Sequence, residues 1–217
     1  MYKSFMTNSL TAEAIIPALT EQVDRRKSLL QAAFDVIAAS GFEGLRTRAV
    51  AERAGVNIAT LHYYFPTKQS LIEGLAQFLS GIFQTLHAPP GPSTGRPFLD
   101  QLRQEFTDAQ FYQEHHPELG VVLQELTLRA NRDEAIKAAM NIMVVSWRYW
   151  IESIVRGGIA EGTFRQDLDP QTTIPTLMAV LAGDRFVGIE ELHNIQRGVE
   201  EWLLAPDVKE ELQGERQ

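Results

Sequence analysis

T-R-A-V-A-E-R-A-G-V-N-I-A-T-L-H-Y-Y-F-P-T-K, from Thr47 to Lys68, has the pattern of two short helices joined by a tight turn. Gly55 is placed to end the first helix, because glycine reaches the left-handed backbone conformation without a Cβ penalty. Thr47 is expected to cap the first helix and Asn57 the second. Pro66 then stops the second helix.

The two sides of the second helix differ in polarity. At about 100° per residue, Leu61 and Phe65 share one apolar face. The opposite side is small or polar and carries Ala59, Thr60, His62 and Tyr63. This arrangement predicts a helix-turn-helix, and an ordinary hairpin within a helical domain is the alternative on spacing alone.

Two cations stand at positions that disfavour them. Arg48 follows the expected cap Thr47, and Lys68 follows the expected cap Thr67. The helix macrodipole disfavours positive charge in the first turn by about 0.3–1 kcal/mol. A DNA phosphate at each helix start would compensate, and we favour this interpretation over side chains that simply bend into solvent.

The charge of the chain is unevenly divided. Its 217 residues carry a net charge of −8. From Glu21 to Ile72, seven Lys or Arg oppose five Asp or Glu, a balance of +2, whereas from Glu73 onward twelve oppose twenty-two, a balance of −10. Nucleic-acid affinity depends on local positive charge, so a module of +2 is expected to need two copies in a dimer.

The remaining sequence is also helical in pattern. Asp24 opens a segment with an amphipathic stripe from Leu30 to Ala38, which Gly41 ends. After a loop rich in proline and glycine at residues 87–97, helices are expected near 98–112, 118–130, 133–158, 170–186 and 189–203, with a polar tail beyond Pro206.

These segments predict an all-α fold. A three-helix helix-turn-helix DNA-binding domain is expected at residues 21–72, followed by a larger helical ligand-binding and dimerisation domain at 73–217. Residues 1–20 match no strong pattern and are expected to form an extension.

Other classes of protein find no support. There is no cysteine, and no H-E-x-x-H, G-x-S-x-G or P-loop motif, so we expect no enzyme, cofactor or metal. His115-His116 lacks metal-ligand spacing and is interpreted as a polar helix end. No apolar run or signal peptide predicts a membrane partner, so a soluble, cytoplasmic protein is expected.

The opening stretch resembles the TetR (tetracycline-repressor) family of bacterial one-component regulators. The similarity is densest in G-V-N-I-A-T-L-H-Y-Y-F-P-T-K-Q-S-L, residues 55–71, and extends through A-A-F-D-V-I-A-A-S-G-F, residues 32–42. E-G-T-F-R-Q-D-L-D-P, residues 161–170, is a weaker match to the turn before the last two helices of this family.

The resemblance implies a homodimer that binds a near-palindromic double-stranded DNA operator and usually represses until a small molecule releases it. By motif position, Ala59 and Thr60 fall at base-edge contacts, with Asn57 and Ile58 beside them. Phosphate-contacting positions fall at His62, Tyr63 and Lys68, and Arg48 starts the preceding helix. Many relatives have Tyr-His-Tyr where this chain has His62-Tyr63-Tyr64. Since Ile58 is apolar, specificity is expected to rest on thymine methyl contacts and DNA shape.

The larger domain holds candidates for an effector site and a dimer interface. A set of aromatic and methionine side chains is expected to line a pocket for an apolar or amphipathic effector: Phe83, Phe106, Phe111, Tyr112, Met140, Met143, Trp147 and Trp150. A plain helical core is the alternative. The last two helices are expected to form the homodimer interface. A small-molecule carrier or enzyme with a vestigial helix-turn-helix remains the rival function.

Overall fold

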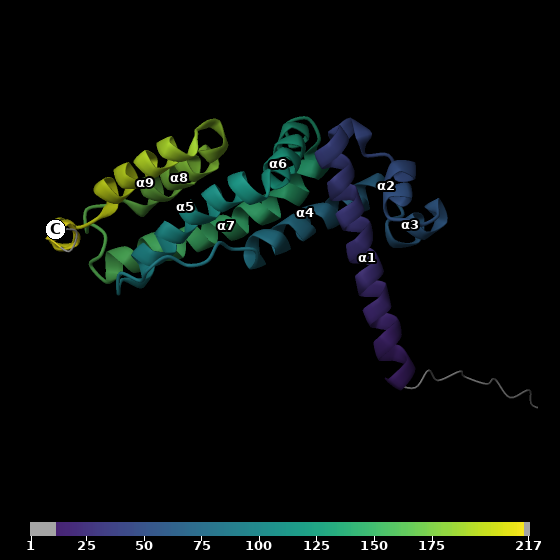
Figure 1. Cartoon of the computed structure of the whole chain (residues 1–217), viewed down its shortest axis with the longest axis horizontal. Coiled ribbons are helices and arrows are strands. Elements are labelled where there is room, and N and C mark those ends of the chain that lie inside the picture. Colours follow the sequence, from purple (N-terminus) through teal and green to yellow (C-terminus); the bar gives the residue numbers. More distant parts are fainter. Residues whose placement is uncertain (1–11, 215–217) are drawn as a thin grey trace, which may run out of the picture. The chain divides into compact units, whose positions relative to one another are not determined.

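The computed structural model describes the backbone of residues 12–214 and the side chains of residues 23–184, 186–212 and 214. The fold is all-α, as predicted, and no strand is present in residues 12–214 (Figure 1). The chain divides into two compact units, and the division falls between Phe78 and Leu79, inside helix α4. The predicted boundary after residue 72 remains a prediction.

The first unit contains a long helix, a 3-10 turn and the two short helices of the opening stretch. Its elements are α1 (Ala12–Ser40), η1 (Phe42–Gly44), α2 (Thr47–Arg53), α3 (Ile58–Tyr64) and the start of α4 (Lys68–Thr85). The predicted stripe on α1 is buried, with Ala33 and Ile37 fully inaccessible to solvent. Arg53 of α2 binds Asp35 of α1 through Nε at 3.0 Å and Nη2 at 2.9 Å.

Helix α1 begins earlier than the sequence pattern indicated. It starts at Ala12 rather than near Asp24, so the backbone of residues 12–20 is helical, and the extension expected at residues 1–20 remains a prediction. Alanine, leucine and glutamate, which are strong helix formers, occupy part of this segment, and Pro17 lies within it. Residues 1–11, for which an extension was also predicted, lie outside the described residues.

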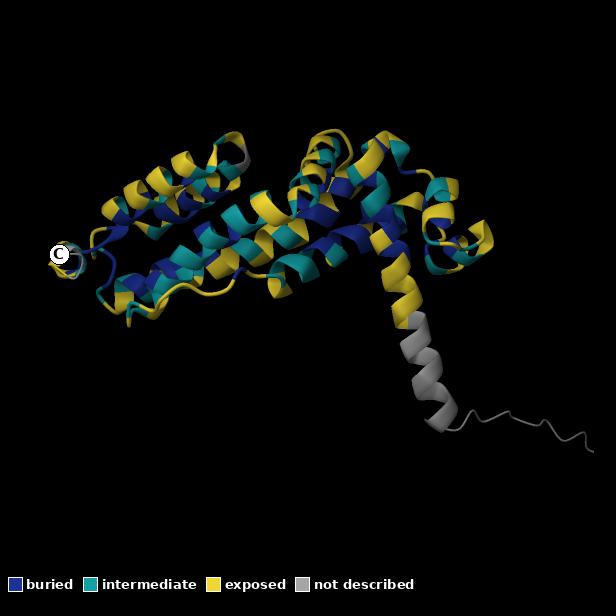
Figure 2. Ribbon diagram, viewed as in Figure 1, coloured by how far each residue is buried: buried dark blue, intermediate teal, exposed yellow. Residues whose placement is uncertain are grey.

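The second unit is built around α5, which contacts α6, α7, α8 and α9. The elements are α5 (Pro97–His115), α6 (Pro117–Ala130), α7 (Glu134–Ala160), α8 (Pro170–Ala182), η2 (Asp184–Phe186), α9 (Ile189–Leu203) and α10 (Pro206–Gly214). On α8 and α9 the buried residues face inward and the exposed ones outward (Figure 2). Arg103 of α5 binds Glu200 of α9 at 2.9 and 2.8 Å, which ties the two helices together.

Helix α7 continues past the two glycines that were expected to end it. It runs to Ala160, and Gly157 and Gly158 lie inside its last turns. A Cβ on Gly157 would lie 2.2 Å from the ring of Phe98, and a Cβ on Gly158 would lie 2.2 Å from the ring of Phe164. The glycines therefore admit two aromatic rings against the helix backbone.

The chain adds a helix where only a polar tail was predicted. Helix α10 follows Pro206, and its Val208 is buried with the core of the second unit. The helices predicted as the last two, α8 and α9, are thus followed by another. The expected dimer interface on α8 and α9 is still a prediction, although these helices are not the last.

We expect Gly158→Ala to destabilise the protein by about 1–3 kcal/mol, because the added methyl group overlaps the buried ring of Phe164. Gly120→Ala on α6 is the matched control, since its added Cβ has no heavy atom within 4 Å. That control is expected to be neutral or stabilising by up to about 1 kcal/mol. Urea unfolding measures both; equal effects of the two substitutions would contradict the packing argument.

Candidate functional site

The turn between α2 and α3 is fixed by glycine, as predicted. Gly55 has φ 65°, its N–H donates to the Glu52 carbonyl at 3.1 Å, and the Val56 N–H donates to the Ala51 carbonyl at 2.9 Å. This pair of hydrogen bonds closes the C-terminus of α2 in a Schellman motif. The other end differs from the prediction, because Arg46 occupies the N-cap and makes no side-chain capping bond, so Thr47 is not the cap.

Helix α3 is held by its inner face and capped at its start. Asn57 Oδ1 accepts from the Thr60 N–H at 2.7 Å, which confirms the predicted cap, and also from the Thr60 hydroxyl at 3.0 Å. Leu61 is fully buried and Phe65 is 2% exposed. The capping bonds therefore engage the two polar side chains at the start of the helix, and the outward face is left with few polar groups.

The other predicted DNA-contacting side chains lie at the surface of the first unit. Ile58 and Tyr63 are 37% and 71% exposed. Arg48 and Lys68 are exposed, as are Ala59 and His62. These outward positions leave all of them accessible to a partner.

Lys68 has a compensating contact within the fold. Its ammonium lies 4.7 Å from the centre of the Phe42 ring, a cation–π contact that offsets part of the cost of a cation at a helix start. Thr67 caps the same helix, as predicted, by accepting from the Ser70 N–H at 3.0 Å. The cost of the cation at α4 therefore does not by itself require a phosphate.

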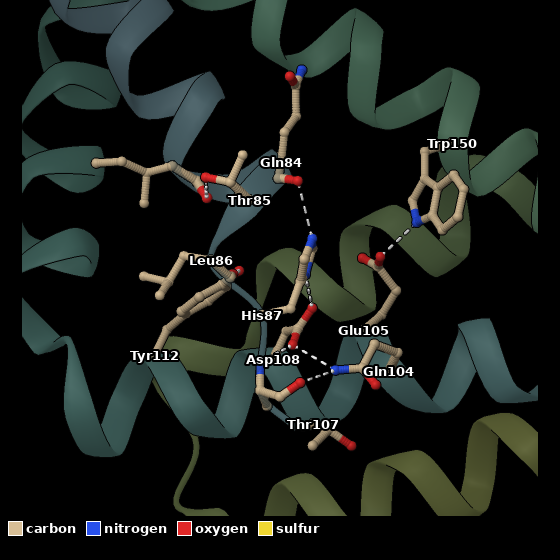
Figure 3. Close-up of polar contacts among 12 residues, drawn as sticks. Gln84, Thr85, Leu86, His87, Gln104, Glu105, Thr107, Asp108, Tyr112 and Trp150 are labelled. Atoms are coloured by element: carbon tan, nitrogen blue, oxygen red, sulfur yellow. Dashed lines mark hydrogen bonds and ion pairs between the residues drawn. The ribbon is translucent and has the colours of Figure 1, made fainter. Parts of the chain in front are cut away.

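A second cluster of functional groups lies in the other unit, between α5 and α7. Both oxygens of Glu105 accept hydrogen bonds from indoles, Oε2 from Trp147 at 3.0 Å and Oε1 from Trp150 at 2.7 Å. Figure 3 shows the Trp150 indole directed at this carboxylate. Burial is the largest influence on Glu105 and raises its pKa above the ordinary 4.5.

One turn further along α5, Asp108 holds the segment that follows α4. Its side chain is bonded to His87 Nδ1 at 2.6 Å and accepts from the Ala88 N–H at 2.8 Å (Figure 3). Gln104 donates to the same carboxylate at 2.8 Å and to the Ala88 carbonyl at 3.1 Å. The Tyr112 hydroxyl donates to the Leu86 carbonyl at 2.6 Å, so the segment from 86 to 88 is fastened to α5 at several points.

Both ring nitrogens of His87 face acceptors. Nδ1 lies against Asp108, and Nε2 lies 3.3 Å from the Gln84 carbonyl. Only the protonated imidazolium can donate from both nitrogens. The hydrogen bond to Asp108 accordingly raises the pKa of His87 above the ordinary 6.5.

The predicted effector residues do not all lie in one cluster. Phe83 meets Tyr112 edge to face with ring centres 5.4 Å apart, and Met140 and Met143 share the α7 face that carries Trp147 and Trp150. Phe111 stacks on His115, the last residue of α5, so the expected helix end at His115-His116 is confirmed. Phe106 is 2% exposed and belongs to the core cluster instead.

Sequence reasoning missed the polar members of this cluster. Glu105, Asp108, Gln104 and His87 belong to no recognisable motif, and their partners lie on other elements. Among the side chains that the structure describes (residues 23–184, 186–212 and 214), no group of three or more His, Asp or Glu is arranged to hold a metal ion. Among the described helices, none has the length and apolarity that a membrane span requires.

The helix-turn-helix geometry agrees with comparisons to known proteins. The model of the family described as "Bacterial regulatory proteins, tetR family" matches residues 29–75, the segment that contains α2, α3 and the start of α4. Residues 29–75 of this chain are therefore similar to the TetR family. The TetR fold also extends over the second unit, as a solved structure shows. A TetR-family transcriptional regulator from Rhodococcus sp. superimposes with a TM-score of 0.71 at 23% identity, covering 84% of this chain and 100% of that one.

Two curated relatives are named as transcriptional regulators. The probable HTH-type transcriptional regulator YttP of Bacillus subtilis is 27% identical over 139 residues, 63% of this chain and 66% of that protein. The HTH-type transcriptional repressor KstR of Rhodococcus jostii is 41% identical over 71 residues, 32% of this chain and 34% of that protein. The matched region thus spans about one third to two thirds of these relatives. Both are named as regulators and neither as an enzyme.

We expect the pKa of His87 to lie above 6.5 in the folded protein and to fall in Asp108→Asn, because the hydrogen bond to Asp108 is the main cause of the shift. A raised folded-state pKa stabilises the protein below the unfolded pKa, and this contribution is lost as pH rises through the folded value. The difference in free energy of unfolding between wild type and His87→Gln should therefore be largest below pH about 6.5 and shrink as the pH rises above it. NMR titration and urea unfolding measure these quantities; a difference that stays constant would contradict the assignment.

Proposed function

We propose that this protein is a dimeric transcriptional repressor that binds a near-palindromic operator in the cytoplasm and is released by a small apolar or amphipathic molecule. The observation that carries the proposal is α3, which is anchored by buried Leu61 and Phe65 and turns an exposed, accessible face outward. A second helix fixed in this way behind a glycine turn is the form that enters the major groove in helix-turn-helix proteins.

We assign base-edge contacts to the start of α3. Ala59 and Thr60 would meet the bases, with Asn57 and Ile58 beside them. Because Asn57 and Thr60 already hydrogen-bond to each other, apolar contact from Ile58 and Ala59 with thymine methyl groups would supply much of the selectivity.

Affinity would come mainly from the phosphate backbone. Arg48, His62, Tyr63 and Lys68 are exposed and are placed on or beside the two helices, where phosphate contacts are expected. The phenol of Tyr63 is oriented by an edge-to-face contact with Tyr64, ring centres 5.1 Å apart. Such contacts fix the register of the protein on DNA without selecting a sequence.

Helix α4 would couple ligand binding to DNA binding. It is one continuous helix from Lys68, beside the DNA-contacting residues, to Thr85, just before the segment fastened to α5 by Asp108. A ligand that favours one arrangement of the second unit would then shift the population of DNA-binding dimers, whose recognition helices must lie about 34–36 Å apart.

The rival function is a carrier or enzyme with a vestigial helix-turn-helix. Such a protein would not require Arg48, Tyr63 and Lys68 to remain exposed beside α3. The rival function also predicts that no operator is bound and that ligand binding does not affect DNA binding. DNA-binding measurements therefore distinguish the two functions.

We expect Lys68→Ala to weaken binding to operator and unrelated DNA alike, because the ammonium contacts phosphate and not bases. The slope of log affinity against log salt should become shallower by about 1 per subunit. With one phosphate contact fewer per subunit, fewer counterions are released on binding. Fluorescence anisotropy with labelled DNA at several salt concentrations measures both. Lys137→Ala is the matched control, an exposed lysine at the start of α7. An unchanged slope in Lys68→Ala would remove this residue from the interface.

We further expect Ala179→Glu to dissociate the dimer, because Ala179 is exposed on α8 and a glutamate there would place like charges opposite one another across an isologous interface. Ala135→Glu, exposed at the start of α7, is the control of equal charge and size. Sedimentation equilibrium reports the oligomeric state. A dimer that survives Ala179→Glu and fails in the control would place the interface elsewhere.

A further inference from the structure

The two carboxylates of the α5 cluster have different partners. Asp108 meets the His87 imidazole, a backbone N–H and the Gln104 amide. Glu105 meets two indole N–H groups, which are neutral donors. In the part of the chain that the structure describes, no ion pair includes Glu105, and His87 acts on it only through space.

Glu105 therefore carries a charge that burial disfavours and that no hydrogen-bonded cation balances. A carboxylate removed from water without a positive partner shifts toward its neutral form, which is the direction seen for its pKa. Asp108, on the same face of α5, adds repulsion in the same direction. A positive charge beside Glu105 would offset both the cost of burying its carboxylate and the repulsion from Asp108.

The neighbourhood of Glu105 suits an organic cation and not a metal ion. Indole N–H groups donate hydrogen bonds and cannot ligate Mg²⁺ or Ca²⁺, which require several oxygen ligands. Aromatic faces attract ammonium groups, and tryptophan is the strongest of them. Trp150 is 44% exposed, so a ligand can approach, and Met143 lies one helical turn from Trp147 on the same face of α7.

We propose that Glu105, Trp147 and Trp150 bind an organic ammonium ion that carries an apolar group, with Met143 contacting the apolar part. This cation is the effector of the proposed repressor, so its regulatory role rests on the function proposed above. The carboxylate provides the charge, the indoles hold that carboxylate in place and offer their rings, and the apolar group covers the exposed surface of α7.

The test uses a pair of ligands that differ by one charge, benzyltrimethylammonium and its uncharged carbon isostere neopentylbenzene. Titration of the full-length protein, followed by tryptophan fluorescence and calorimetry, should show at least about tenfold tighter binding of the cation. Glu105→Gln, which keeps an oxygen acceptor for an indole, should weaken cation binding at least about tenfold and leave neopentylbenzene unaffected. Glu210→Gln, exposed on α10, is the control for loss of one negative charge.

A second variant tests the site independently, in case Glu105→Gln weakens binding only by disturbing the fold. Trp150→Leu keeps an apolar side chain without the aromatic face and should reduce cation affinity about three- to tenfold. Equal binding of the two ligands by wild type, no binding of the cation, or unchanged affinity in both variants would overturn the site.

Operator binding is measured separately, without ligand and at saturating cation. Intact operator binding together with absent cation binding would sink the site and leave the repressor proposal standing. Cation binding that disappears in Glu105→Gln but leaves operator affinity unaltered would establish the site and reject its role as the effector site. Absent operator binding would reject the repressor function, while the fluorescence titration still decides the cation site.

Discussion

The burial of Leu61 and Phe65 is the interaction on which the first unit depends. A helix of seven residues such as α3 is too short to be stable alone in water, because too few hydrogen bonds follow its costly nucleation. Its orientation is therefore imposed by two buried side chains, the Asn57 cap and the glycine turn before it. These anchors leave the outer face of α3 exposed, so its residues can vary without loss of the fold.

The predictions that succeeded were those governed by neighbouring residues. The turn at Gly55 and the caps at Asn57 and Thr67 depend on hydrogen bonds that close within a few positions of the chain. Thr47 failed as a cap because the helix began one residue earlier than its capping role required, with Arg46 at the N-cap. Local chemistry can thus be predicted from sequence, whereas the first residue of a helix is less well defined, as α2 and α1 show.

Other predictions failed because contacts between distant elements decided the outcome. Gly157 and Gly158 resemble a helix end in sequence, and only the rings of Phe98 and Phe164 explain why the helix continues. Likewise, the aromatic residues of the candidate effector site were identifiable by type, whereas Glu105 was not, because its indole partners come from another helix 42 and 45 positions away. Phe106 could likewise be distinguished from the other candidate effector residues only from the fold. Its aromatic side chain is typical of a ligand pocket, but it lies in the core cluster of the second unit.

The close approach of two rings to the backbone of α7 also constrains how this sequence can diverge. A side chain at position 157 is admissible only if position 98 becomes smaller, and positions 158 and 164 are linked in the same way. Each pair must change jointly or pass through a destabilised intermediate, so homologues should retain glycine opposite an aromatic ring or exchange both members together. Correlated substitutions at these two pairs would then reflect packing against α7, independently of which DNA or ligand each homologue binds.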